Sequence, residues 1–465
     1  MSLDGTRSLD PTILREYDIR GIVGQSLTVE DVFAIGRAFG TMVAESGGSS
    51  VAVGYDGRLS SPDLETAVID GLSASGLKVF RVGRGPTPML YFATYHLEAS
   101  AGLMITGSHN PPEYNGIKMS IGGKAFYGDA IQRLGVIAAA GAFVEGAGAS
   151  IVDRPVFDAY VDRLCAAYEE GDGPAVVWDP GNGAAGDVVA ALCQRLPGHH
   201  AAINCEIDGT FPSHHPDPTV EANLEQLKAA VIGEGRELGV AFDGDGDRIG
   251  VVDSQGRVLW GDQLLLVLAG DVLAANPGAT IIADVKASQV LFDEIERLGG
   301  KALMWRTGHS LIKAKMAEIG APLAGEMSGH IFFGAPYYGF DDALYAAIRL
   351  LSVVMRDGRG LDAIRDAMPQ AVNTPELRFD CAEDRKFEVV EEVRRRLEDA
   401  VGVTVHDIDG VRVQSEDGWW LLRASNTQAV LVARCEAADA AGLDRLKAAL
   451  SEALRASGIE PPAFD

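Results

Sequence analysis

The chain has 465 residues, which is enough for three or four domains that each bury a core. Its formal net charge of -26, from 40 basic and 66 acidic residues, argues against a surface for nucleic acid or for an anionic membrane. Hydrophobic residues make up 47% and no apolar run approaches the ~20 residues of a transmembrane helix. The N-terminus is polar and carries acid, so we do not expect it to be a secretory signal. The five scattered cysteines lack CxxC spacing, which indicates buried thiols in a reducing cytoplasm.

The first motif is residues 15–21, REYDIRG, ahead of a helix expected over about 29–46. Two interpretations stay open for it, a charged surface turn or a loop that brings Arg20 to a site. The following elements alternate, with strands over 51–55, 78–82 and 103–105 and helices over 61 onward and 88–96. This order predicts a largely parallel sheet.

Residues 106–118, TGSHNPPEYNGIK, follow the last of these strands. Gly107 allows a sharp turn and two prolines stiffen the exit, so the loop should hold Ser108 rigidly at a strand end. That is a common place for a nucleophile, whose hydroxyl needs a neighbouring charge or base, and His109 and Lys118 are the nearest candidates. An ordinary Gly/Pro turn is the alternative.

A Gly/Ala-rich stretch over 138–150 looks like a boundary or an excursion, and a second α/β unit begins with a strand over 175–178. Two histidine pairs in this unit could suggest a metal site, at 199–200 and at 214–215. Both lie in Pro-rich loops without acidic or cysteine partners at ligand spacing. We therefore interpret them as surface or loop-shaping residues.

A strand over 239–242 leads into residues 243–248, DGDGDR. Three carboxylates at alternate positions, spaced by glycine, can turn toward one point on a tight loop. Hard oxygen ligands gathered in this way suit Mg²⁺. An EF-hand would need a glutamate at its twelfth position, where this chain has Ser254, so that alternative fails. The sequence predicts a magnesium site on Asp243, Asp245 and Asp247.

Polar residues also follow three later strands. Lys286 follows a strand over 280–285, RTGH at 306–309 follows one over 302–305, and GEMSGH at 325–330 follows one over 323–324. The carboxyl ends of strands in one sheet are where α/β proteins bind ligands. Taken together, these residues favour a function over helix capping.

From about Pro369 the pattern changes to strands clustered between two helices, which indicates a separate α+β domain. Residues 423–427, RASNT, lie between its last two strands, expected over 420–423 and 430–433. The motif offers an arginine with hydroxyl and amide donors and no acid. This composition is typical of an anion-binding loop.

The motifs at 106–118, 243–248, 325–330 and 423–427 occur in the order and at the intervals of the α-D-phosphohexomutase superfamily. The chain resembles this superfamily from Tyr17 to about Thr427, and GEMSGH has the phosphomannomutase/phosphoglucomutase form. The resemblance implies three mixed or parallel α/β sandwich domains and a C-terminal α+β domain around a central cleft. We expect their boundaries at 1–152, 153–253, 254–368 and 369–465.

The resemblance further implies a phosphohexomutase that interconverts the 1- and 6-phosphates of mannose and glucose through a phosphoserine enzyme and a hexose 1,6-bisphosphate. It implies Mg²⁺, the bisphosphate as activator, small sugar phosphates as the only partners, and a monomer or weak homodimer. A phosphoglucosamine mutase and a phosphatase remain as alternatives. A non-catalytic sugar-phosphate sensor would tend to lose the chemistry residues that are present here.

Roles are carried over from the family residue by residue. Ser108 would be the phosphoryl carrier, and a set of six would supply positive charge and proton transfer: Arg20, His109, Lys118, Arg248, Lys286 and His309. The sequence does not choose between Lys118 and His309 as general acid or base. Substrate binding falls to Tyr17, Lys286, Gly308, Glu326, Ser328, His330, Arg423, Ser425, Asn426 and Thr427. The metal would lie on the three aspartates and an oxygen of phosphorylated Ser108. The family commonly continues Glu-Pro after Thr427, where this chain has Gln428-Ala429, which leaves the rigidity of that loop in question.

Overall fold

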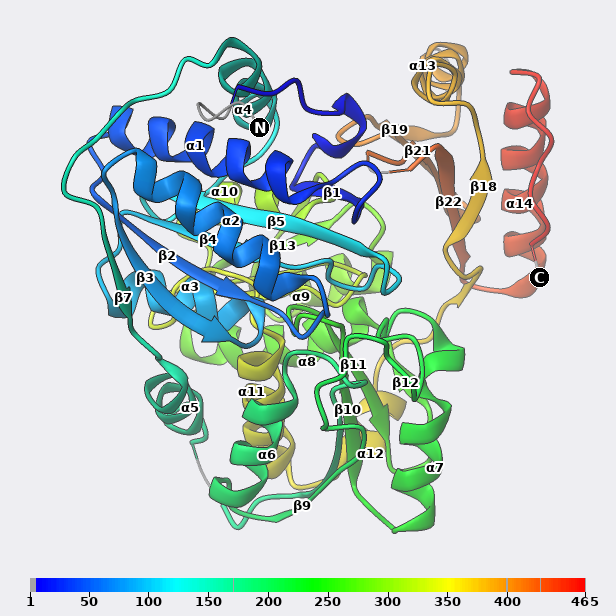
Figure 1. The fold of residues 1–465 in the computed structure, drawn as a ribbon. Helices are drawn as coiled ribbons and strands as arrows, with labels where there is room; N and C mark the ends of the chain where they lie inside the picture. The colour runs from blue at the N-terminus through cyan, green and yellow to red at the C-terminus, as the bar shows by residue number, and fades with distance from the viewer. Residues whose placement is uncertain (1–5, 170, 399, 427, 465) are drawn as a thin grey trace.

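The computed structural model describes residues 6–169, 171–398, 400–426 and 428–464. The chain forms four units in sequence order, each built on its own sheet. In Figure 1 the fourth unit, coloured orange to red, stands to one side of the other three. Among the described residues, no helix combines the length and the apolar character that crossing a membrane requires. The expected α/β architecture with a C-terminal α+β unit is confirmed.

The first unit has the strand order β1-β5-β4-β2-β3-β7, in which β4, β2, β3 and β7 are parallel. Its elements are η1 (Pro11–Ile13), β1 (Ile19–Ile22), α1 (Val29–Glu45), β2 (Ser50–Tyr55), α2 (Ser61–Ala74), β3 (Lys78–Arg84), α3 (Thr87–His96), β4 (Ala101–Ile105), β5 (Tyr114–Ile121), β6 (Lys124–Ala125), α4 (Asp129–Ala140) and β7 (Ser150–Asp153).

The sequence interpretation missed four strands of this sheet: β1, β5, β6 and β7. β1 and β5 begin within the motifs at 15–21 and 106–118, and they pair with each other in antiparallel register. β7 pairs with β3 after the Gly/Ala-rich stretch, so that stretch is an excursion from the first sheet. Neither motif is therefore loop throughout, and Lys118 is held on a strand opposite Met104.

The second unit has the order β12-β11-β10-β8-β9 and the third β14-β13-β15-β16, each with parallel central strands. The second contains α5 (Phe157–Cys165), β8 (Ala175–Asp179), α6 (Gly186–Arg195), β9 (His199–Ala202), η2 (Glu221–Leu224), α7 (Glu225–Gly233), β10 (Leu238–Phe242), β11 (Ile249–Asp253) and β12 (Val258–Leu259). The third contains α8 (Gly261–Ala275), β13 (Thr280–Asp284), α9 (Gln289–Arg297), β14 (Lys301–Trp305), α10 (His309–Ile319), β15 (Leu323–Gly325), β16 (Ile331–Phe333), α11 (Ala343–Asp357) and α12 (Leu361–Asp366).

The fourth unit is an antiparallel sheet with the order β17-β22-β21-β20-β19, and β18 also pairs with β22. Its elements are β17 (Val372–Asn373), β18 (Leu377–Asp380), α13 (Lys386–Leu397), β19 (Thr404–His406), β20 (Val411–Ser415), β21 (Gly418–Ala424), β22 (Val430–Ala437) and α14 (Ala440–Arg455). All five cysteines are free thiols, but only Cys381 and Cys435 are buried, so the expectation of buried thiols is wrong for the other three.

One apolar core runs through the first three units, from Leu90 on α3 through Trp178 on β8 to Leu268 on α8. Strand alternation on β2 divides its side chains between two cores. Val53 packs with α1 and α2 in a core of the first unit alone, whereas Ala52 joins the shared core. Continuous close packing therefore fixes the first three units relative to one another.

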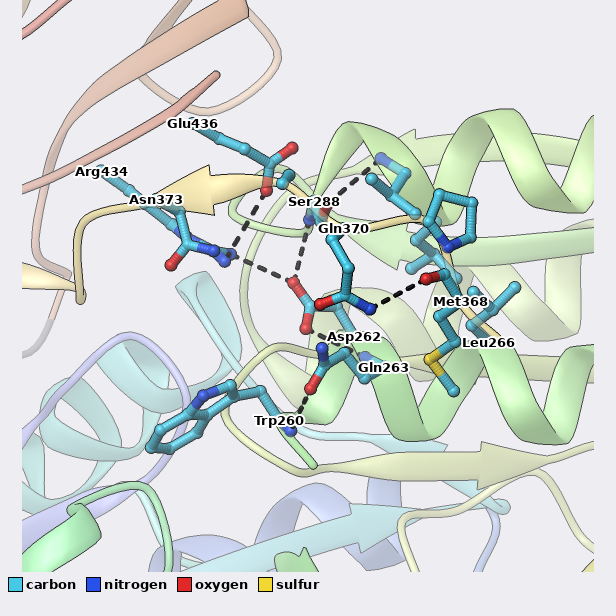
Figure 2. Close-up of a pocket in the computed structure, with 14 residues that line it drawn as sticks. Trp260, Asp262, Gln263, Leu266, Ser288, Met368, Gln370, Asn373, Arg434 and Glu436 are labelled. Carbon is cyan, nitrogen blue, oxygen red and sulfur yellow. Dashed lines mark hydrogen bonds and ion pairs between the residues drawn. The ribbon is translucent and has the colours of Figure 1, made fainter. Parts of the chain in front are cut away.

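The fourth unit has a separate core and joins the third through polar contacts and a small apolar cluster of Val285 with Trp419 and Leu421. Arg412 donates to the carbonyls of Val285 and Ala287, each at 2.7 Å. Arg434 donates to the carbonyl of Lys286 at 2.6 Å and lies 3.1 Å from a carboxylate oxygen of Asp262. Figure 2 shows Arg434 and Asp262 at the wall of a cavity at this junction, which no predicted catalytic residue lines. Two buried arginines thus anchor the backbone of the loop that carries Lys286.

Candidate active site

Ser108 lies directly after β4 and has a φ of 48°, a left-handed conformation that is uncommon for a residue other than glycine. Its amide donates to Thr106 Oγ1 at 2.9 Å. Its hydroxyl donates to Asp243 Oδ2 at 2.9 Å and lies 3.2 Å from His109 Nδ1. A Cβ on Gly244 would lie 2.3 Å from the Ser108 carbonyl oxygen, so glycine allows this close approach. The serine loop of the first unit (residues 106–118) therefore contacts the aspartate loop of the second (residues 243–248).

The three aspartates predicted to bind metal are fully buried, and one carboxylate oxygen from each lies within 4.8 Å of the other two. Lys118 Nζ donates to Asp245 Oδ2 at 2.7 Å and also to Asp247. Thr87 Oγ1 donates to Asp245 at 2.5 Å. Burial, together with the charges of Asp247 and Asp245, raises the pKa of Asp243 well above its ordinary value.

The donor set of this cluster fits a divalent cation. Asp245 Oδ1 and Asp247 Oδ1 are buried and have no hydrogen-bond partner among the described residues, although buried carboxylate oxygens are ordinarily satisfied. Together with Asp243 they form an all-oxygen set of the kind that Mg²⁺ prefers. A second group that could hold a metal, Asp247 with His330 and Asp341, includes an imidazole and suits Mg²⁺ less well.

Lys118 and His109, the two groups predicted to flank Ser108, differ in their charge. Burial opposes the charge on Lys118, but Asp245 and Asp247 outweigh it and hold the pKa of the ammonium well above its ordinary value. Burial lowers the pKa of His109 well below its ordinary value, and Arg248 adds to that shift. Lys118 is therefore a fixed cation, and His109 is a neutral imidazole.

His330 and His309 of the third unit lie beside one buried carboxylate. Arg248 Nε donates to His330 Nε2 at 3.0 Å, and His330 Nδ1 lies 3.1 Å from Asp341 Oδ2. His309 Nδ1 lies 3.6 Å from the same oxygen, and the two rings stack with centroids 5.4 Å apart. Lys313 Nζ donates to Asp341 at 2.9 Å. Burial, reinforced by Lys313, lowers the pKa of His309 well below its ordinary value, so His309 is neutral and able to accept a proton.

In the predicted sugar loop, residues 325–330, the Glu326 carboxylate accepts two hydrogen bonds. Its Oε1 accepts from the Gly308 amide at 2.5 Å and its Oε2 accepts from Ser328 Oγ at 2.9 Å. Gly308 has a φ of 132°, and a Cβ there would lie 2.6 Å from the Tyr17 ring. Only glycine satisfies both conditions. The motifs at 306–309 and 325–330 thus form one site with Tyr17.

Tyr17 also links the first unit to the fourth. Its hydroxyl donates to the carbonyl of Thr307 at 2.9 Å and accepts from Asn426 Nδ2 at 2.6 Å. Arg423 Nε donates to Asp409 Oδ2 at 3.1 Å, and that oxygen accepts from the Thr307 amide at 3.0 Å. The motif at 423–427 contains no acid, but folding brings Asp409 from elsewhere in the fourth unit to its arginine.

Arg20 and Lys286 both occupy ion pairs. Arg20 lies 2.8 Å from Asp18 and donates to Asn110 Oδ1 at 2.6 Å, which places it beside the serine loop as predicted. Lys286 Nζ donates to Glu376 Oε2 at 2.8 Å, a residue that follows the junction with the fourth unit. No ion pair or side-chain hydrogen bond in the described chain joins Lys286 to another predicted site residue.

The loop at 423–427, which continues with Gln428-Ala429 where the family commonly has Glu-Pro, is held by other contacts. The carbonyl of Gln428 accepts from the buried Lys386 ammonium at 2.9 Å, and its side chain accepts from Arg378 at 3.1 Å. Ser425 Oγ accepts from the Gln428 amide at 3.2 Å. Thr427 lies outside the described residues. These contacts restrain the loop in place of a proline.

The two histidine pairs of the second unit differ in placement: His199 and His200 lie on strand β9, so the expected loop is wrong for them, whereas His214 and His215 lie in a loop as expected. His200 Nδ1 accepts from Trp178 Nε1 at 3.0 Å, and His214 Nε2 lies 2.9 Å from Asp179 Oδ2. The expectation that His214 lacks an acidic partner is therefore wrong. Neither histidine belongs to a possible metal-binding group in the part of the chain that the structure describes.

Sequence analysis missed three groups that complete the site: Asp341, Asp409 and Arg58. Asp341 precedes α11, where an acid is ordinarily explained by the positive end of the helix. Asp409 lies in a turn of the fourth unit without a motif. Arg58 had a usable signal, because Asp56, Gly57 and Arg58 directly follow β2 and meet the strand-end criterion applied elsewhere.

Models of the four domains of phosphoglucomutase/phosphomannomutase match nearly the whole chain: alpha/beta/alpha domain I at residues 11–143, domain II at 158–256, domain III at 260–372 and the C-terminal domain at 376–453. The chain belongs to this family. A phosphomannomutase/phosphoglucomutase of Pseudomonas aeruginosa is 44% identical over 98% of each chain. A phosphoglucomutase of Neisseria gonorrhoeae is 42% identical over 95% of this chain and 96% of its own.

Solved structures agree with this membership. A phosphoglucomutase/phosphomannomutase family protein from Burkholderia thailandensis superimposes with a TM-score of 0.92 at 41% identity, covering 98% of this chain and 100% of that one. An N-acetylphosphoglucosamine mutase from Aspergillus fumigatus reaches 0.63 at 14% identity, covering 95% and 96%, which shows the fold alone. This member of the family is a hexose phosphate mutase, an isomerase.

The aspartate cluster generates the first prediction. Asp245→Asn should weaken Mg²⁺ binding at least about tenfold, because affinity for this hard cation follows the number of charged oxygen ligands. Titration calorimetry with MgCl₂ measures the change. Asp208→Asn, which alters a partly exposed carboxylate of the same unit outside the cluster, is the control and should bind as wild type does. Equal affinity in Asp245→Asn and wild type would place the cation elsewhere.

Proposed function

We propose that this enzyme moves a phosphoryl group between O1 and O6 of a hexose through phosphorylated Ser108 and a hexose 1,6-bisphosphate. The observation that carries the proposal is the contact of Ser108 Oγ with Asp243, at the centre of the buried carboxylate cluster. Ser108 is 2% exposed, so water has little access to the phosphoryl acceptor. That burial favours a mutase over a phosphatase.

The charge on the transferring group requires compensation. Asp243, Asp245 and Asp247 would hold Mg²⁺, which neutralises charge on phosphoryl oxygens when it is bound. The Lys118 ammonium contacts Asp245 and Asp247 and balances the negative charge of these two carboxylates. Arg20 and Arg248 would supply further positive charge toward the phosphoryl group.

Proton transfer falls to the third unit. His309 is neutral and lies beside Asp341, whereas Lys118 is held as a cation and is a poor proton acceptor. We therefore propose His309 over Lys118 as the general base. His330 Nε2 accepts from Arg248 Nε, and its Nδ1 lies 3.1 Å from Asp341 Oδ2.

The remaining site residues bind the substrate. Glu326 and Ser328 would contact two adjacent ring hydroxyls, and Lys286 with the 423–427 loop would hold the phosphate that does not react. Glucose and mannose phosphates are the proposed substrates, since the relatives at 44% identity carry both activities in their names. We further propose hexose 1,6-bisphosphate as activator and a cytoplasmic monomer or weak homodimer.

Ser108→Ala tests the covalent mechanism. Loss of the nucleophile should reduce kcat by several orders of magnitude while substrate binding survives. A coupled assay measures kcat, and intact mass after incubation with glucose 1,6-bisphosphate should show a phosphoryl adduct on wild type alone. Ser120→Ala, a buried serine on β5, is the control and should keep the adduct. More than about a tenth of wild-type kcat in Ser108→Ala would rule out the covalent route.

Arg423→Ala tests the phosphate loop. A charge-assisted hydrogen bond contributes about 1.5–3 kcal/mol, so the dissociation constant for glucose 1-phosphate should rise roughly ten- to hundredfold. Titration with the Ser108→Ala background prevents turnover during the measurement. Arg445→Ala removes an exposed arginine of the same unit and should leave binding unchanged. An unaltered dissociation constant in Arg423→Ala would place the phosphate elsewhere.

Sugar specificity gives a further prediction. Glucose and mannose differ only at C2, and Glu326 and Ser328 suit a pair of adjacent hydroxyls that the two sugars share. Discrimination in kcat/KM should therefore be about tenfold or less, because no buried polar group is left unpaired by the wrong epimer. Parallel assays with glucose 1-phosphate and mannose 1-phosphate decide the question. A preference above about a thousandfold, or turnover of glucosamine phosphate alone, would contradict dual specificity.

A further inference from the structure

One buried arginine, Arg58, binds the backbone of the serine loop. Arg58 directly follows β2 and is 2% exposed. Its Nη1 donates to the carbonyls of Pro111 at 2.6 Å and Tyr114 at 2.9 Å. Its Nη2 donates to the carbonyls of Ser108 at 2.7 Å and Asn110 at 2.5 Å. A single guanidinium thus ties four carbonyls of the loop to one rigid plane, which no other side chain can do.

Asp56 holds the residue that precedes Ser108 in the same loop. Its Oδ2 accepts from the Gly107 amide at 3.1 Å and lies 3.3 Å from Arg58 Nε. Its Oδ1 accepts from the Arg58 amide at 3.0 Å and from Ser61 Oγ at 2.6 Å. The amide before Ser108 and the carbonyl of Ser108 are therefore both held by residues at the end of β2.

The loop lies close against this support. A Cβ on Gly107 would lie 2.5 Å from Arg58 Cζ, so the backbone packs directly on the guanidinium. Arg58 also reaches the second unit, where its guanidinium lies 5.2 Å from the Phe211 ring centroid. A Cβ on Gly209 would lie 2.6 Å from Arg58 Cα. Arg58 therefore holds the serine loop at the interface where the aspartate loop approaches it.

We infer that Arg58 is a positioning residue for phosphoryl transfer, which fixes the backbone of the serine loop so that Ser108 Oγ faces the carboxylate cluster. Arg58 donates to no group that reacts, and it acts through the backbone. The left-handed conformation of Ser108 is unfavourable for a non-glycine residue and persists only where surrounding contacts fix it. A displacement of the nucleophile by about 1 Å is enough to slow a reaction about a hundredfold. The inference rests on the proposed role of Ser108.

The test uses Arg58→Lys in the full chain. Lysine keeps the charge beside Asp56 and loses the fork that binds four carbonyls. We expect kcat to fall about a hundredfold, with KM for glucose 1-phosphate within about threefold of wild type. Single-turnover phosphorylation of the dephosphorylated enzyme by glucose 1,6-bisphosphate should slow by the same factor. Amide hydrogen exchange should rise in residues 107–116 and stay unchanged in the third unit.

Arg37→Lys is the matched control. Arg37 is a buried arginine of the same unit that pairs with Glu145 on the far side of α1, and it does not contact the serine loop. Its kcat should remain within about twofold of wild type, since its loss affects stability and not the nucleophile. A large loss in Arg37→Lys as well would show a general effect of removing buried arginines and overturn the inference.

A second variant, Gly107→Ala, disturbs the same contact from the loop side. It replaces Arg58→Lys in the test if that variant does not fold. It should reproduce the fall in kcat, and the double variant should lose no more than the more damaged single variant. Arg58→Lys with kcat within about threefold of wild type, or with a raised KM alone, overturns the inference. So does a fall in kcat without faster exchange in the loop. Failure of the phosphoserine role itself would appear separately, as activity in Ser108→Ala.

Discussion

The buried charge balance between the first and second units is the constraint on which the rest of the site depends. Asp243, Asp245 and Asp247 are fully buried, and three uncompensated carboxylates so close together would be strongly unfavourable. Lys118, on a strand of the first unit, supplies the compensating charge across the interface. The two sheets must therefore be docked for the cluster to exist, and that docking also brings Ser108 to Asp243.

Two kinds of interface then divide the molecule. The first three units share one apolar core, so the serine loop, the aspartate cluster and the histidines have fixed relative positions. The fourth unit has its own core and meets the third through Arg412, Arg434 and a small apolar cluster of Val285 with Trp419 and Leu421. Small junctions with many polar contacts shift at lower cost than extensive close-packed apolar ones. The chemical groups therefore lie in the rigid part, and Arg423 and Asn426 come from the unit joined by the weaker interface.

The charge distribution explains how a chain of net charge -26 can bind phosphate. Three cations of the site form ion pairs with acidic side chains in this structure: Arg20 with Asp18, Lys286 with Glu376, and Arg423 with Asp409. Such pairs keep buried cations compensated without substrate and hold their side chains in place. Phosphate oxygens would be alternative acceptors for the same donors. Local pairing, and not the net charge, sets the electrostatics of the site.

The sequence by itself determined that Ser108 and the three aspartates lie on loops at strand ends, because short runs of this composition have few other uses. The four-unit architecture followed from the order of the strand and helix patterns and of the motifs along the chain. Strand-end motifs also identified Glu326, His330 and Arg423. Only the tertiary structure placed Asp341 beside two histidines, Asp409 on Arg423 and Arg58 beneath the serine loop. These partners lie from 11 to 102 residues away from the groups they contact, as in the pairs Asp341–His330 and Asp409–Thr307. Local pattern carries no information at that separation, since the contact exists only after sheets and interfaces have formed.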